Sequence, residues 1–247
     1  MIKSESSLRI LLLQIRDNTQ VRKEEHDSFV RYSGLDASQI HILNVFNTPV
    51  FDPDVMDGYD ALFVGGASEA SVLEPDTNPF LESGMRLMRY CADQDIPVFA
   101  SCFGFQLAAV AFGREIFRDE KNFEQGSIPI ILTDQATADP LFHDTPNPFL
   151  AVSVHRERAL KAPDGFETLA YTDLCCHAFR IPGKRFWAFQ FHPEVDRDIL
   201  IERLTIYKDR YTDNDEHLGR ILVAVQETPE SNILIRKFVS RVLMQQV

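Results

Sequence analysis

Short apolar runs alternate with longer segments of helical spacing through the first half of the chain. Four runs have the length and apolar content of buried β-strands: 8–15, 39–46, 60–64 and 96–100. Three segments have helical spacing: the polar segment around Phe29 that ends at Gly34, residues 79–94, and residues 106–112. Because buried strands and helices take turns along the chain, the pattern predicts an α/β fold with an open, mostly parallel sheet flanked by helices.

The pattern changes from about residue 115 to short strands separated by turns. Five strands are predicted there: 128–132, 149–154, 167–171, 175–181 and 185–191. The turn Ile-Pro-Gly-Lys-Arg joins the last two, which favours a β-hairpin. The sheet is therefore expected to gain an antiparallel extension.

The tail after Pro193 is predicted to be helical. A polar interruption is expected at 211–219, where the acidic run 213–217 is interpreted as a solvated turn, and a final helix is expected near Ile233 to Met244.

The chain shows no internal repeat, low-complexity segment or obvious linker, which favours one domain over residues 1–247. Its core is expected at about 8–195 and a helical C-terminal extension at 196–247. The 247 residues, 45% of them hydrophobic, are enough for a sizeable core.

Composition also narrows the partners and the compartment. A formal net charge of −12 argues against nucleic acid or an anionic membrane surface as the main partner. No apolar run approaches the length of a membrane span. The N-terminal residues MIKSESS lack the apolar core and cleavage site of a signal peptide, so a cytoplasmic protein is expected.

Four cysteines occur, without a CxxC pair or the spacing of a disulfide framework: Cys91, Cys102, Cys175 and Cys176. The adjacent Cys175 and Cys176 are interpreted as strand residues with one thiol facing inward, the alternative being a vicinal disulfide or a metal site. Neither a metal nor a cofactor is expected.

Cys102 lies in the stretch Ala100-Ser101-Cys102-Phe103-Gly104, which has the small-x-nucleophile-x-Gly form of a strand-to-helix elbow. The sharp turn needs small residues two positions either side of the nucleophile, because their side chains would otherwise collide. The N-terminus of the following helix stabilises a thiolate by roughly 0.3–1 kcal/mol. The alternative is a buried core cysteine, and this stretch alone leaves both open.

His192 follows the predicted strand 185–191 and precedes Pro193 and Glu194. Proline cannot continue a central strand, so the imidazole is expected at the carboxyl end of its strand. Open α/β sheets hold their sites at that edge, where Cys102 also lies. Glu194 is close enough to orient the imidazole. Taken alone, the tripeptide also suits a surface turn; together with the elbow, it predicts a Cys-His-Glu triad.

Three blocks resemble the class I glutamine amidotransferases, a triad-type family with a flavodoxin-like α/β fold: FVGGASEAS (63–71), CFGFQLAA (102–109) and FQFHPEVD (189–196). A weaker fourth block is SVHRERAL (153–160). The resemblance covers about residues 8 to 195 and is strongest to stand-alone members similar to the glutaminase part of GMP synthase.

The resemblance implies that Cys102 attacks the side-chain amide of glutamine, that His192 carries the proton and that Glu194 orients His192. It implies an oxyanion hole at the backbone N–H groups of Gly66 and Phe103. It also implies substrate contacts from Gly65, Gln106 and His155. On residue type alone, His155 could instead be an exposed histidine at a strand end, and Gly65-Gly66 could be a tight turn.

Three positions depart from the family pattern. Ala100 stands where the family usually has glycine, Phe105 replaces a commonly polar residue, and the loop Gly-Gly-Ala-Ser lacks a proline often found there. The first is small enough for the elbow; the others bear on the pocket wall and the shape of the loop.

Three functions are compatible with these residues. The first is hydrolysis of glutamine with ammonia passed to a partner synthase or ligase on another chain. The second is a γ-glutamyl peptidase or hydrolase that uses the same triad on γ-glutamyl peptides or conjugates. The third is a non-catalytic regulatory or binding module, against which the retention of Cys102, His192 and Glu194 argues.

Overall fold

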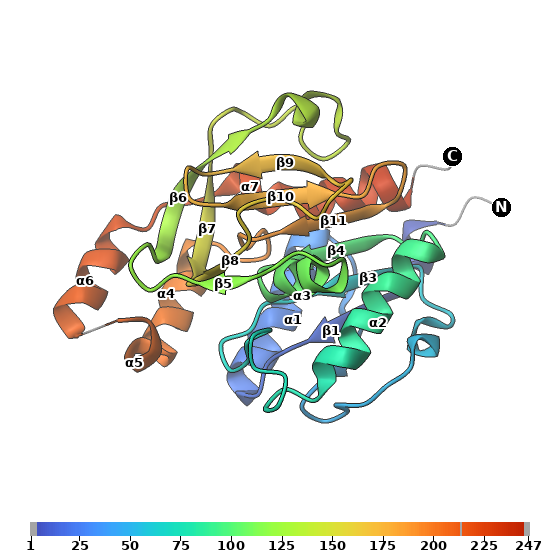
Figure 1. The fold of residues 1–247 in the computed structure, drawn as a ribbon, viewed down its shortest axis with the longest axis horizontal. Helices are drawn as coiled ribbons and strands as arrows, with labels where there is room; N and C mark the ends of the chain where they lie inside the picture. The colour runs from blue at the N-terminus through green and yellow to red at the C-terminus, as the bar shows by residue number, and fades with distance from the viewer. Residues whose placement is uncertain (1–3, 213, 245–247) are drawn as a thin grey trace.

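A nine-stranded sheet runs through the molecule, and the computed structural model describes it within residues 4–212 and 214–244 (Figure 1). The strand order is β2-β1-β3-β4-β11-β10-β9-β6-β7. Five neighbouring strands are parallel: β1 (Ile10–Gln14), β2 (Ile40–Asn44), β3 (Ala61–Val64), β4 (Val98–Ser101) and β11 (Phe186–Phe189). The predicted parallel sheet is confirmed. Strands β1, β3, β4 and β11 are buried throughout and mostly apolar, whereas the edge strand β2 is partly exposed.

The antiparallel extension is also confirmed. It consists of β6 (Glu124–Leu132), β7 (Phe149–His155), β9 (Glu167–Tyr171) and β10 (Cys176–Arg180). The predicted hairpin is β10 paired with β11. Two details differ from the prediction. β6 begins four residues earlier than expected, in a polar stretch, and a small second sheet joins β5 (Phe117–Arg118) to β8 (Glu157–Arg158).

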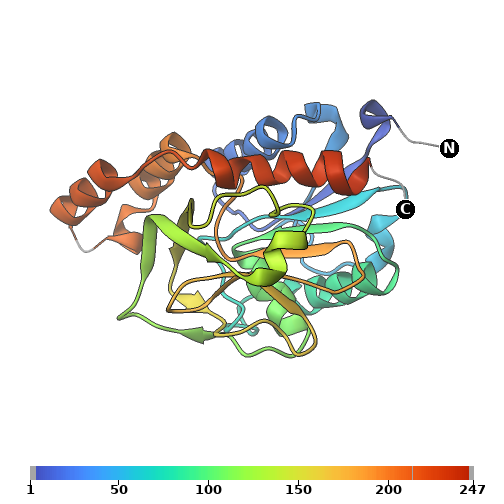
Figure 2. The ribbon, with the colours of Figure 1, turned by 90° about the horizontal axis from the view of Figure 1, so that it is seen from above.

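Helices cover both faces of the parallel part. One core cluster packs α2 (Phe80–Asp93) and α3 (Phe103–Ala111) on one face. The other packs α1 (Thr19–Ser33) and α7 (Pro229–Phe238) on the opposite face, where Figure 2 shows α7 running across the sheet. The helix predicted at 106–112 begins earlier, directly after Cys102. Helix α1 ends as predicted, because Gly34 adopts a left-handed φ of 72°.

The tail contains α4 (Arg197–Ile206), α5 (Lys208–Tyr211) and α6 (Asp215–Ala224) before α7 and a π-helix at Val239–Leu243. The solvated turn predicted at 213–217 is wrong for residues 215–217, which form the first turn of α6. Asn214 caps this helix by accepting a hydrogen bond from the His217 N–H. Residue 213 lies outside the described residues, as do residues 1–3 and 245–247 of the predicted termini.

Four short 3-10 helices lie at Glu5–Ser7, Ala37–Gln39, Pro53–Met56 and Asp134–Ala138. Within the described ranges, no helix has both the length and the apolar content that crossing a membrane requires.

Candidate active site

Cys102 lies at a sharp turn between β4 and α3. Its backbone has φ 50° and ψ −97°, a conformation that a non-glycine residue rarely adopts. Its N–H donates a 2.7 Å hydrogen bond to the carbonyl of Phe189, which fixes the turn to β11. A Cβ added to Gly104 would lie 2.9 Å from Val64 Cβ and 3.0 Å from Ala100 Cβ. The predicted elbow is present, and the methyl of Ala100 fits because position 104 is glycine.

His192 and Glu194 stand at the carboxyl end of β11, next to this turn. His192 Nδ1 lies 2.7 Å from Glu194 Oε1, and the thiol of Cys102 is close enough to the imidazole to raise its pKa. All three side chains are buried, and Glu194 is fully so. The structure therefore places a thiol, an imidazole and a carboxylate in the order that a cysteine triad requires.

Neighbouring charges shift the pKa values of both His192 and Glu194. Burial lowers the pKa of His192, but the charges of Cys102 and Glu194 and their hydrogen bonds outweigh it and raise the pKa to about 9. Burial raises the pKa of Glu194, but the charge and hydrogen bond of His192 and the charge of Arg203 outweigh it and lower the pKa to about 2. Glu194 is therefore a carboxylate at neutral pH, and the site favours a protonated His192.

The paired glycines of the loop after β3 lie against this row. A Cβ on Gly66 would be 2.7 Å from His192 Cε1 and 2.9 Å from Arg16 Nη2, and one on Gly65 would be 2.6 Å from Glu25 Oε1. Glycine is needed here because of close packing, so a simple tight turn does not account for the pair. Whether the N–H groups of Gly66 and Phe103 bind an oxyanion stays a prediction.

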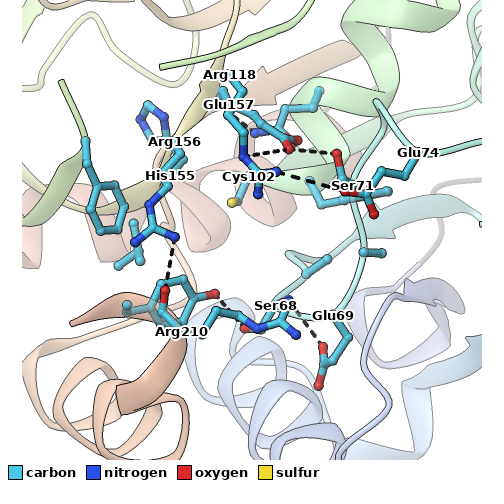
Figure 3. Close-up of a pocket in the computed structure, with 17 residues that line it drawn as sticks. Ser68, Glu69, Ser71, Glu74, Cys102, Arg118, His155, Arg156, Glu157 and Arg210 are labelled. Atoms are coloured by element: carbon cyan, nitrogen blue, oxygen red, sulfur yellow. Dashed lines mark hydrogen bonds and ion pairs between the residues drawn. The ribbon is translucent and has the colours of Figure 1, made fainter. Parts of the chain in front are cut away.

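A cavity of about 130 Å³ opens beside Cys102 (Figure 3). Gln106 and His155 line it, as predicted, together with residues of both charge signs, among them Glu74, Arg118, Arg156, Glu157 and Arg210. Gln106 Nε2 donates to the backbone carbonyl of Glu157 over 2.9 Å, and Ser71 Oγ donates to Glu157 Oε1 over 2.7 Å. The cavity thus presents a thiol, an amide, carboxylates and guanidinium groups to one small polar ligand.

The family model for class I glutamine amidotransferases matches residues 43–199, more than half of the chain. The chain belongs to this family. The family accounts for a cysteine-nucleophile amidohydrolase site at the edge of a mostly parallel sheet, which is what the fold presents.

Curated relatives of this amidotransferase include GMP synthases. It is 32% identical over 118 residues to one of the subunits of the GMP synthase [glutamine-hydrolyzing] of Methanocaldococcus jannaschii, and this match covers 47% of the chain and 61% of the relative. It is 28% identical over 186 residues to the GMP synthase [glutamine-hydrolyzing] of Thermotoga maritima, covering 74% of the chain and 33% of the relative. The chain thus spans less than two thirds of the length of each of these relatives.

Solved structures share the fold of this amidotransferase. A glutamine amidotransferase from Thermotoga maritima superposes with a TM-score of 0.78 at 17% identity, over 97% of this chain and 99% of the other. One from Methylobacillus flagellatus gives a TM-score of 0.67 at 15% identity, over 98% and 96% of the two chains. These likenesses support the whole fold, including the tail.

Residues of the amidotransferase's helical tail hold the triad, and sequence reasoning missed them. Asn232 in α7 donates from Nδ2 to the carbonyls of Pro193 and Val195, both over 2.9 Å. Arg203 in α4 has one guanidinium nitrogen 4.0 Å from Glu194 Oε1. Both polar side chains are buried, and no local sequence pattern indicated this, because their burial depends on how the tail helices pack.

The tail also forms one wall of the cavity. Arg210 donates to the carbonyl of Ser68, and the Tyr211 hydroxyl donates to Ser68 Oγ over 2.9 Å (Figure 3). Arg156 in turn donates to the carbonyl of Arg210 over 3.0 Å. Helix α5 therefore closes the cavity against the loop after β3, a contact that no local sequence pattern indicates.

A second group of buried polar side chains lies beside the cavity. His177 Nε2 and Cys175 Sγ are 3.2 Å and 3.3 Å from Glu124 Oε2, and His155 Nε2 is 3.2 Å from the same oxygen. Burial lowers the pKa of His155 to about 4, against the opposing effect of Glu124. His155 is thus a buried pocket residue, and its interpretation as an exposed strand-end histidine is wrong.

The adjacent cysteines also differ from the expectation. Both thiols are buried, not one, and both are free. Cys175 Sγ points to Glu124, whereas Cys176 Sγ lies 3.6 Å from the carbonyl of Ala178 and belongs to the core under α3. Cys175 precedes β10, which begins at Cys176, so the two neighbouring thiols lie in different buried regions.

Proposed function

We propose that this protein hydrolyses the side-chain amide of glutamine through a γ-glutamyl thioester on Cys102. The observation that carries the proposal is the buried row Cys102–His192–Glu194 at the edge of a cavity fit for a small polar ligand. An isolated histidine in such a buried position would be neutral. Here the thiol and the carboxylate favour its protonated form, which is the state that an imidazole paired with a thiolate nucleophile needs.

The reaction runs in two steps. Cys102 Sγ attacks the amide carbon, and the N–H groups of Gly66 and Phe103 stabilise the negative oxygen. His192 gives its proton to the amide nitrogen, the carbon–nitrogen bond breaks, and ammonia leaves. His192 then takes a proton from water, whose oxygen attacks the thioester, and glutamate leaves as the thiolate of Cys102 and the imidazolium re-form. Glu194 keeps the imidazole oriented through both steps.

The lining of the cavity suits the amino-acid end of glutamine. A zwitterion needs one negative and one positive group, and the cavity supplies both, with Glu157 held by Ser71 and Arg118 Nε 3.8 Å from Glu157 Oε1 (Figure 3). Gln106 and His155 line the proposed substrate pocket beside Cys102. Gly65 does not line this cavity and packs against the carboxylate of Glu25.

We further propose that the ammonia goes to a separate synthase or ligase. One relative is named as a single subunit of GMP synthase, which is the support for an acceptor on another chain. The match to the second relative, the GMP synthase of Thermotoga maritima, covers only 33% of that protein. A protein that supplies ammonia to a partner would release glutamate faster when the partner is bound.

Labelling of Cys102 by a glutamine-like diazoketone tests the nucleophile without any partner. The experiment compares wild type, Cys102→Ala and Cys176→Ala by mass spectrometry, together with release of glutamate from glutamine and from γ-glutamyl peptides. We expect one label on wild type and on Cys176→Ala, none on Cys102→Ala, and preference for glutamine. Equal labelling of all three proteins would refute the assignment of Cys102, and preference for γ-glutamyl peptides would refute glutamine as the substrate.

A further inference from the structure

Four side chains from different parts of the antiparallel extension converge at one buried point. Glu124 begins β6, His155 ends β7, His177 lies in β10 and Cys175 directly precedes β10. Each is at least nine-tenths buried. One ligand atom from each lies within 4.8 Å of the other three, so a single small ion could contact all four.

The donor atoms are of the kind that zinc prefers. Two imidazole nitrogens, a thiol sulfur and a carboxylate oxygen make a mixed set of nitrogen, sulfur and oxygen donors, and zinc takes all three types in tetrahedral sites. The hard cations calcium and magnesium would instead need mainly oxygen ligands. The residue types therefore select a borderline-soft transition metal.

The three distances from Glu124 Oε2 are close to the edges of such a tetrahedron, and the other three donor pairs lie within 4.8 Å. Metal bonds of the usual lengths place neighbouring donors about 3.3–3.6 Å apart. Glu124 Oε2 lies 3.2 Å from both imidazole Nε2 atoms and 3.3 Å from Cys175 Sγ. Three edges thus need to widen by only a few tenths of an ångström to admit the ion.

Hydrogen bonding leaves part of this group unsatisfied. His177 Nε2 and Cys175 Sγ have the geometry of hydrogen bonds to Glu124, but His155 Nε2 does not, although it is equally near. Neither ring nitrogen of His155 has a hydrogen-bond partner among the residues that the structure describes, and the side chain is 2% exposed. A buried nitrogen that faces three other donors without a bond of its own is a polar group aimed into the site.

We propose that Glu124, His155, Cys175 and His177 bind one zinc ion. Cys175 binds as a thiolate and releases its proton to solvent, so that thiolate and carboxylate together balance the charge of the ion. All four positions are filled by protein, which is the arrangement of a structural site. The ion would tie β6, β7 and β10 together behind the cavity wall that His155 forms, and the cavity gives it a route of entry.

Thr172, which is not a proposed ligand, holds one of the ligands in place. Its hydroxyl donates to Glu124 Oε1 over 2.9 Å, which leaves Oε2 for the ion and fixes the carboxylate. The two imidazole rings lie 5.5 Å apart, centroid to centroid, at 60° to each other, so both nitrogens approach the point from different sides.

Zinc titration of the chelator-treated protein tests the site. Four variants are compared with wild type: Cys175→Ser and His177→Gln remove ligands, Cys176→Ala is the matched control next in the chain, and Cys102→Ala removes the other thiol–imidazole pair that could bind zinc. We expect one zinc per chain for wild type and for both controls. Zinc binding should be at least about 100-fold weaker in the two ligand variants, because losing a residue that only supports a ligand already weakens metal binding by up to about 100-fold.

Cobalt substitution in the Cys102→Ala background keeps the test valid if a ligand variant fails to fold. Cobalt bound to Cys175 will show thiolate-to-metal charge-transfer absorption, and zinc will displace it. Circular dichroism reports folding of each variant. The site is refuted if wild type binds no stoichiometric zinc, if Cys102→Ala abolishes binding, or if Cys175→Ser binds as tightly as wild type; in each case the four side chains form a metal-free polar cluster.

Discussion

Among the residues that the structure describes, two buried groups combine histidine with a carboxylate, and the pKa of His192 in one and of His155 in the other is shifted in opposite directions. In the triad, one imidazole lies between a thiol and a carboxylate, with His192 Nδ1 2.7 Å from Glu194. In the second group, two imidazoles approach one oxygen of Glu124, each at 3.2 Å. Both groups are almost completely removed from solvent, so burial acts alike on them.

The pKa values show the consequence. Burial lowers the pKa of both His192 and His155, but two acidic neighbours raise that of His192 to about 9. His155 has to share Glu124 with His177 and feels the charge of Arg158, so its pKa stays low, at about 4. The charged groups around His192 and His155 therefore shift the pKa values of these two buried imidazoles in opposite directions. The first set of neighbours favours a protonated His192, and the second favours a neutral His155.

Removing the thiol of the triad gives the largest expected effect. Cys102→Ala eliminates the nucleophile, so we expect glutamine hydrolysis to fall by at least about 10⁴-fold. Cys176→Ala removes a buried thiol from the core beside the second group and should leave the rate within a few-fold of wild type. Steady-state release of glutamate measures both. Similar losses in the two variants would mean that the buried thiols act through stability and not through chemistry.

Neutralising the carboxylate of the triad should give the second largest loss of activity. Glu194→Gln keeps the shape of the side chain but removes the charge next to His192, so we expect the rate to fall by about 10²–10⁴-fold. The pKa of His192 should fall as well, because burial is then opposed only by Cys102. Proton NMR of the ring measures the pKa, and Glu82→Gln, on the exposed side of α2, is the control. An unchanged pKa would show that Glu194 does not set the charge of His192.

The triad could be predicted from the sequence because each of its parts is local. The elbow is fixed by small residues within two positions of Cys102, and Pro193 places His192 at a strand end. The parallel strands were found for a similar reason, since each is a short apolar run. What these local features could not give is the support of Glu194 by Arg203 or of Pro193 by Asn232, which depends on how the tail helices pack.

The second group had no comparable local pattern. Glu124 and His155 are paired in register across β6 and β7, although they are about thirty positions apart, and His177 joins them from a strand two places further along the sheet. The start of β6 was also missed, because its first residues are polar. The meeting of these side chains therefore depends on strand register, which no spacing along the chain reveals.

A methyl group at the elbow should disturb the triad and leave the group around Glu124 unchanged. The Cβ of Gly104→Ala would press on Val64 and Ala100 at about 3 Å, so we expect a loss of about 1–3 kcal/mol in the free energy of unfolding. Gly219→Ala, in α6 with no atom within 4 Å, should instead stabilise the protein by about 0.5–1 kcal/mol. Urea unfolding measures both variants. Equal effects would show that the elbow has room for a side chain.

The pH dependence of stability should separate the two histidines, because they titrate in different pH windows. His192 has a raised pKa, so its contribution is complete below its unfolded value of 6.5 and is lost as the pH rises through about 9. His155 has a lowered pKa, so the folded state binds fewer protons and stability falls as the pH drops from 6.5 toward 4. Because each histidine binds at most one proton, it can change the free energy of unfolding by at most about 1.4 kcal/mol per pH unit.

Urea unfolding of metal-free wild type, His192→Gln and His155→Gln across this pH range separates the two windows. His192→Gln should flatten the curve on the alkaline side only, and His155→Gln on the acid side only, because each variant removes one titration and leaves the other. If both variants lost the pH dependence on the same side of the curve, the two imidazoles would titrate as one coupled system. The contrast between one histidine with two acids and two histidines with one acid would then no longer explain their charges.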